Sequence, residues 1–229
     1  MQKIIQIKDM SYSIPYSDSI LEHLDLEVNA GEFIGILGHN GAGKTTLMDL
    51  LMGFRKSSSG QLEIMGEDPH AIARSHRKDV VFLSQEVSIK SSISIRQFLK
   101  FHSSFYDSYS LEEEAHLLKV FNLDPEARIG SLSTGQQKKV QVVANLSVKP
   151  KLILIDEITA VMDPETRQIF FNEIARMRKV HGSAVILATN IAEDLVERVD
   201  KIYFIRGKNG ALYSPQEISR LFNLDVEAA

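Results

Sequence analysis

A glycine-rich run at residues 38–45, with the sequence GHNGAGKT, is the feature that most restricts the fold of this chain. It fits the pattern G-x-x-x-x-G-K-[ST], in which glycines let backbone N–H groups approach phosphate oxygens and the lysine reaches the β- and γ-phosphates. An apolar segment at 32–37 precedes the run, and a segment with helical spacing follows at 46–52. A strand, a loop and a helix in this order place an anion at a helix N-terminus, where the helix dipole favours it. The sequence therefore predicts a triphosphate site made of Gly38, His39, Asn40, Gly41, Ala42, Gly43, Lys44, Thr45 and Thr46, in which Thr45 also holds Mg²⁺.

Further apolar segments predict the sheet around this loop. Continuous apolar runs occupy 80–83, 151–155, 183–189 and 201–206, and helical patterns separate several of them. Strands buried on both faces have such runs, and their alternation with helices favours an α/β fold with a parallel sheet. Residues 1–37 differ, because their shorter apolar patterns are typical of short strands joined by turns.

Three polar residues indicate where helices begin. Ser94 with Gln97, and Ser110 with Glu113, have the spacing of capping boxes, and Asp163 followed by Pro164 predicts a helix over 164–180. Residues 86–149 are therefore expected to be mostly helical. The acidic run at 112–114 is expected to be a solvated helix face.

Two carboxylates end the apolar run that begins at residue 151. Because ligands in α/β sheets bind at the carboxyl ends of strands, Asp156 is placed to hold the water shell of Mg²⁺. The adjacent Glu157 is placed to orient or activate an attacking water.

A cluster of serine, threonine and glycine at residues 132–136 precedes a helix expected at 137–148. Such a cluster is usually a helix cap. It also fits a second anion site, in which the Ser133 hydroxyl, the Gly135 N–H and the helix dipole face phosphate. The residues alone leave both interpretations open.

Composition removes several classes of function. The formal net charge of −4 gives no electrostatic reason to expect nucleic acid, and the absence of cysteine excludes disulfides and thiolate metal sites. No apolar run approaches the roughly 20 residues that cross a bilayer. Any work at a membrane is therefore expected to need another chain that spans it.

Taken in order along residues 3–210, these motifs resemble those of the ATP-binding cassette (ABC) ATPases. Residues 132–136 are similar to the family signature L-S-G-G-Q, with Thr134 in place of its first glycine. Gln85 resembles the glutamine that contacts Mg²⁺, and residues 160–163 resemble the D-loop that ends in Asp163. The resemblance implies a single domain with a P-loop NTPase core, a mostly parallel sheet flanked by helices, over 1–85 and 150–229. It also implies an N-terminal antiparallel β subdomain and an inserted helical subdomain over 86–149.

The same resemblance implies a site shared by two subunits, identical or different. ATP and Mg²⁺ would bind at the phosphate loop of one subunit, with Thr45, Gln85 and Asp156 at the metal. The second subunit would cover the nucleotide with its signature. The residues that this assigns to the nucleotide across the dimer are Ser133, Gly135, Gln136 and Asp163. The other implied partner is an integral membrane permease, with this chain peripheral at the cytoplasmic face of the cell membrane.

An aromatic residue that stacks on adenine is also implied by the family. The simplest register puts Ile14 at that place, between Tyr12 and Tyr16. We favour Tyr16, while a purely structural role for both tyrosines stays open.

The main departure from the family is Asn190, which stands where these proteins have a histidine that touches the γ-phosphate. Asparagine can donate a hydrogen bond but cannot carry a charge or pass on a proton. In one interpretation, Glu157, helped by Gln85 and Asn190, hydrolyses ATP slowly. The chain then powers a transporter, and its compact length suggests an exporter. In the other, the chain mainly binds ATP as a switch or mechanotransmission subunit and moves no substrate. A DNA-maintenance ATPase is disfavoured, because the long coiled-coil insertions of that class are missing.

Overall fold

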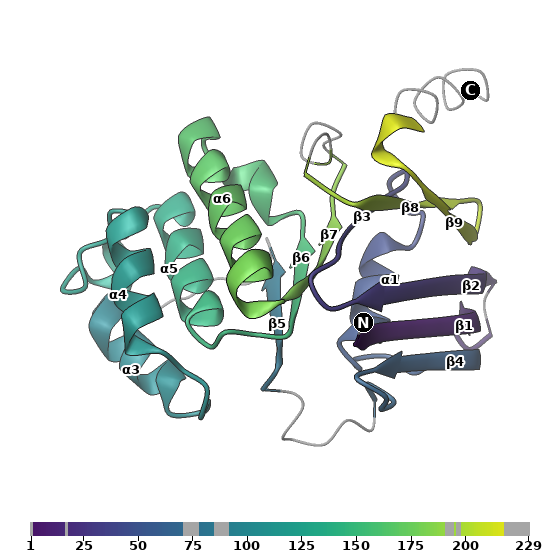
Figure 1. The fold of residues 1–229 in the computed structure, drawn as a ribbon, viewed down its shortest axis with the longest axis horizontal. Helices are drawn as coiled ribbons and strands as arrows, with labels where there is room; N and C mark the ends of the chain where they lie inside the picture. The colour runs from purple at the N-terminus through teal and green to yellow at the C-terminus, as the bar shows by residue number, and fades with distance from the viewer. Residues whose placement is uncertain are drawn as a thin grey trace. The chain divides into compact units, whose positions relative to one another are not determined.

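The computed structural model describes residues 2–16, 18–70, 78–84, 92–190, 195 and 198–217. The chain forms two compact units. The first combines residues 1–72 with 184–229, and the second contains residues 73–183. Figure 1 shows the strands of the first unit and the helices of the second.

An antiparallel sheet in the first unit has the order β2-β1-β4 (Figure 1). Its strands are β1 (Lys3–Ser13), β2 (Ser19–Asn29) and β4 (Ser59–Ile64). Buried and exposed residues alternate along β2, as expected for a strand with one face in the core. The antiparallel arrangement agrees with the prediction, but β1 and β2 have 11 residues each and are not the short strands expected. The register between the two strands shifts at four places along this length, as it does at β-bulges or other irregularities.

The first unit also contains parallel strands around β3 (Phe33–Leu37), which pairs with β7 (Ala184–Ala188) on one side and β8 (Lys201–Arg206) on the other. Every residue of β3 and β7 is buried, which explains their uninterrupted apolar sequences. A hairpin joins β8 to the antiparallel strand β9 (Asn209–Tyr213). The helix α1 (Lys44–Leu51) follows β3, and a short 3₁₀ helix, η4 (Pro215–Glu217), follows β9.

In its described residues, the second unit has two parallel strands, β5 (Val80–Ser84) and β6 (Leu152–Asp156), and four α-helices. The helices are α3 (Ile95–Ser103), α4 (Leu111–Val120), α5 (Thr134–Leu146) and α6 (Pro164–His181), with 3₁₀ turns η1 (Ile129–Ser131) and η2 (Ile158–Val161). The capping box of Ser94 and Gln97 is formed, and Asp163 caps α6. Parallel strands and helices in this arrangement confirm the α/β class.

The expected solvated face at 112–114 is wrong for Glu113. Its carboxylate binds both Nη atoms of Arg176, at 3.1 Å for Nη1, and also lies 3.2 Å from Nε2 of His181. The Arg176 Nε donates to Glu173 at 2.7 Å. The hydrogen bond from the Arg176 guanidinium is the main cause that lowers the pKa of Glu113. The contacts of Glu113 with Arg176 and His181 tie α4 to α6.

Among the residues that the structure describes, none of the helices has the combination of length and apolar sequence needed to cross a bilayer.

Candidate functional site

The phosphate loop joins β3 to α1, as the sequence predicts, and its geometry requires the glycines. Gly41 and Gly43 have φ of 83° and 96°, in the left-handed region that side chains disfavour. Gly38 is required for a different reason, because a Cβ there would lie 2.8 Å from the backbone oxygen of Ile205. A Cβ at Gly41 would meet no atom within 4 Å, so the loop opens toward free space at that point.

The Lys44 ammonium lies within this loop. The residue is buried, and its Nζ donates to the carbonyl oxygens of Gly38 at 2.8 Å and His39 at 3.1 Å. Thr45 is exposed beside it. The helix begins without a side-chain cap, whereas α3, α4, α5 and α6 all have one. An uncapped helix start, open glycines and a lysine held in the loop fit the phosphates of a nucleotide.

Asn190 lies close to the loop, two residues after β7 ends at Ala188. Its Nδ2 donates to Oδ1 of Asn40 at 3.0 Å. The structure thus joins two predicted site residues that are 150 positions apart. The sequence places Asn40 in the loop, but no signal in it identifies this pairing.

Asp156 and Glu157 lie at the carboxyl end of β6, as predicted. Asp156 is buried and is the register partner of Ser84, the last residue of β5. Glu157 is half-buried and has a left-handed backbone, with φ 51° and ψ 14°. Such conformations are sparsely populated for residues with a Cβ and often occur at functional sites. The predicted magnesium residue Gln85 is outside the described residues.

Ser133 is the N-cap of α5, and its Oγ accepts from the N–H of Gln136 at 3.3 Å. The Gln136 Oε1 in return accepts from the N–H of Ser133 at 3.0 Å, which completes a capping box. Both open interpretations of this cluster are compatible, because a hydroxyl that accepts in a cap can still donate its own hydrogen. Gly135 lies in the first turn of α5, where backbone N–H groups have no hydrogen-bond acceptor within the helix.

Asp163 is engaged within its own chain. Its Oδ1 accepts from the N–H of Thr166 at 2.9 Å, and its Oδ2 accepts from the hydroxyl of Thr166 at 2.7 Å. The bond from the Thr166 N–H is the main cause that lowers the pKa of Asp163. The side chain therefore stays ionised as the cap of α6.

The candidates for adenine stacking differ in their surroundings. Tyr12 is buried, and its hydroxyl accepts from Nη1 of Arg55 at 3.0 Å, so it has a structural role. Tyr16 is fully exposed and has a left-handed backbone, with φ 63°. Ile14 is also exposed. Tyr16 is thus the tyrosine of the pair whose ring is accessible to a ligand.

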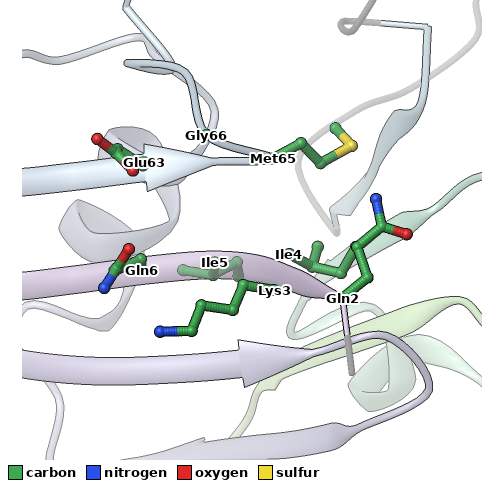
Figure 2. A pocket seen from close by; sticks show the side chains of 8 residues that line it. All are labelled: Gln2, Lys3, Ile4, Ile5, Gln6, Glu63, Met65 and Gly66. Atoms are coloured by element: carbon green, nitrogen blue, oxygen red, sulfur yellow. The ribbon is translucent and has the colours of Figure 1, made fainter.

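No group of three or more histidine, aspartate or glutamate side chains is arranged to hold a metal among the described residues. A pocket of about 360 Å³ lies beside β1 and β4 (Figure 2) and is lined by Gln2, Lys3, Ile4, Ile5, Gln6, Glu63, Met65 and Gly66. None of the predicted site residues lines it.

Comparisons with known proteins agree with these motifs. A family profile described as ABC transporter matches residues 21–160, which is more than half of the chain. The methionine import ATP-binding protein MetN of Clostridium tetani is 29% identical over 228 residues, which cover 96% of this chain and 71% of that protein. The doxorubicin resistance ATP-binding protein DrrA of Mycobacterium tuberculosis is 30% identical over 190 residues, covering 81% of this chain and 57% of that protein.

A solved structure supports the fold. The chain is similar to cbiO1 from Clostridium perfringens, described as part of the ABC transporter complex cbiONQ, with a TM-score of 0.81 and 22% identity. The alignment covers 98% of this chain and 93% of that one. The two chains therefore share nearly their whole architecture.

Proposed function

The chain belongs to the ABC transporter family, and on that basis we propose that it is the subunit that binds and hydrolyses ATP to drive a membrane transporter. The observation that carries the proposal is the phosphate loop, in which two glycines have left-handed backbones and the Lys44 ammonium lies inside the loop. Its relatives include an import protein and a drug-resistance protein. The proposal therefore concerns the ATPase subunit, and a transport assay with the membrane partner distinguishes export from import.

Each predicted site residue has a role in this proposal. The loop N–H groups and Lys44 hold the phosphates. Thr45, Asp156 and Gln85 would hold Mg²⁺, which would offset phosphate charge. Glu157 orients the attacking water and accepts its proton. Asn190 donates one hydrogen bond to the γ-phosphate and cannot pass on a proton, so we propose that hydrolysis is slow.

Binding at the loop is tested by removing the Lys44 ammonium. We expect Lys44→Ala to weaken the binding of a fluorescent ATP analogue by at least tenfold, because the lysine is the main charge in the loop. Lys56→Ala is the matched control, since Lys56 is an exposed lysine shortly after α1 in the same unit. Equal affinity of both variants and the wild-type protein would exclude the loop as the nucleotide site.

A second subunit completes the site in this proposal. Ser133, Gly135 and Gln136 of one copy face the γ-phosphate bound to the other copy, with Asp163 at the same junction, and the Ser133 hydroxyl donates while it remains the cap of α5. We expect Glu157→Gln, which binds but does not hydrolyse ATP, to elute as a dimer with ATP and Mg²⁺ in size-exclusion chromatography. If the chain has a natural partner subunit, the variant is mixed with it before the measurement. Elution as a monomer alone would then contradict the shared site.

We propose that an integral membrane permease binds the second unit, which places the chain peripherally at the cytoplasmic face of the membrane. Phe101 and Phe105 support this, because both are exposed and their rings pack edge to face at 5.0 Å, which forms an apolar surface at the end of α3. We expect the tagged chain to co-purify from native membranes with a protein that has several membrane spans. A Phe101→Ser/Phe105→Ser variant should bind ATP normally but should no longer co-purify with this membrane protein. Retention of the same membrane protein by that variant would exclude this surface.

A further inference from the structure

Lys138 is one of the most deeply buried large side chains of the protein, with 2% of its surface exposed. Lysines are rarely buried to this extent, because the ammonium loses its hydration. Desolvation accordingly lowers the pKa of Lys138. The side chain lies in α5, five positions after the N-cap Ser133.

The ammonium contacts the end of one strand and a polar side chain of its own helix. Its Nζ donates to the carbonyl oxygen of Ser84 at 3.1 Å and lies 3.5 Å from Oε1 of Gln141, which is also buried. Ser84 is the last residue of β5. A buried donor on a helix thus holds the carboxyl end of a strand.

This strand end is the partner of the proposed magnesium ligand. In the parallel β5–β6 pair, Ser84 lies opposite Asp156, at a spacing of about 4.8 Å between neighbouring strands. Glu157 follows Asp156 directly. The Lys138 bond therefore links the helix that begins at Ser133 to the end of the strand pair that carries both carboxylates.

We propose that Lys138 is a positioning residue that fixes the carboxyl end of the β5–β6 pair, and with it Asp156, relative to the helix that begins at Ser133. This inference rests on the proposed function, since Asp156 and Ser133 have roles in ATP hydrolysis only there. We assign the lysine no contact with nucleotide or metal. Its loss should leave the phosphate loop intact and should loosen the strand ends that hold Asp156.

The test replaces the ammonium with an apolar side chain of similar length, Lys138→Met. In hydrogen exchange of the nucleotide-free protein, we expect the amides at the ends of β5 and β6, residues 82–84 and 154–156, to exchange at least tenfold faster. In the ATPase assay, we expect the Mg²⁺ concentration for half-maximal rate to rise at least fivefold and kcat to fall. The KM for ATP should stay within about twofold, because the loop is unchanged.

Lys151→Met is the matched control at the opposite end of the same two strands. Lys151 is half-exposed, and its Nζ binds Oδ2 of Asp79 at 2.9 Å, directly before β5 and β6 begin. This variant also loses one ammonium, but we expect wild-type exchange at 82–84 and 154–156 and a wild-type Mg²⁺ requirement.

Three results would overturn the proposal: unchanged exchange at the strand ends in Lys138→Met, an unchanged Mg²⁺ requirement, or the same effects in Lys151→Met. If Lys138→Met does not fold, Gln141→Leu removes the neighbouring acceptor and should give a smaller increase in the same exchange rates, and no increase would count against the idea. Exchange is measured without nucleotide. A wild-type protein that lacks ATPase activity would therefore refute the proposed function and still leave the Lys138 bond testable.

Discussion

Glu157 has a backbone conformation that a residue with a Cβ adopts at a cost. It lies between β6 and η2 with φ 51° and ψ 14°, in the left-handed region. We predict that Glu157→Gly is more stable to unfolding than Glu157→Ala, although both lack the carboxylate. Both variants lose the same side-chain contacts, so their difference isolates the backbone.

The expected magnitude follows from two opposing terms. The left-handed conformation costs a residue with a Cβ roughly 1–2 kcal/mol. Glycine loses more conformational entropy on folding than alanine, by about 0.5–1 kcal/mol. Glycine at position 157 should therefore be more stable by about 0.5–1 kcal/mol, which corresponds to roughly 1–4 °C in Tm for a chain of this size.

Urea denaturation of the nucleotide-free variants at pH 7 measures this difference as a shift in midpoint at constant slope. Gln168→Gly and Gln168→Ala form the control pair, because Gln168 is exposed within α6 and alanine should be more stable there by about 1 kcal/mol. Opposite signs at the two positions are expected. An alanine variant at 157 that is as stable as the glycine variant would refute the argument from backbone strain.

Three further predictions concern other parts of the molecule. Asn190→His should raise the steady-state ATPase rate about tenfold, because a histidine can carry charge and pass on a proton, and an unchanged or lower rate would count against it. Gly210→Ala should destabilise the protein by about 1–3 kcal/mol in urea titrations. The new Cβ would lie 2.3 Å from the ring of the fully buried Tyr203. Wild-type stability of this variant would contradict the prediction and show that the ring can move. The folded-state pKa of Glu113 is below its ordinary value of 4.5, so its pairing with Arg176 stabilises the fold above that pH, and this contribution is lost as the pH falls below it. The stability difference between the wild-type protein and Arg176→Met should therefore narrow from pH 5 to pH 3, whereas a constant difference would contradict this reasoning.

Local signals in the sequence predict much of this structure. The capping pair of Ser94 and Gln97, the Asp163 cap with Pro164 and the apolar run before Asp156 each depend on residues within a few positions. The phosphate loop is predicted for the same reason, because its glycines satisfy local backbone requirements.

Several contacts that the sequence does not predict join residues that are distant in the chain. Glu113 occupies a helix position that looks solvated, and it is shielded because Arg176, 63 positions away, lies against it. The pairing of Asn40 with Asn190 and the burial of Lys138 against Ser84 also arise only when separate elements pack together. A pattern read within one element contains no information about such neighbours, so these polar contacts require the structure.

The capping box at Ser133 affects how mutagenesis of this corner is interpreted. Replacing the serine with alanine removes an oxygen on which the start of α5 depends, and any lost activity then mixes a frayed helix with a missing ligand contact. Aspartate would preserve the helix cap, but its charge would repel phosphate. Threonine would preserve both the cap and a hydroxyl that can contact phosphate. Comparing these two substitutions is therefore the way to separate architecture from chemistry at a side chain that serves both.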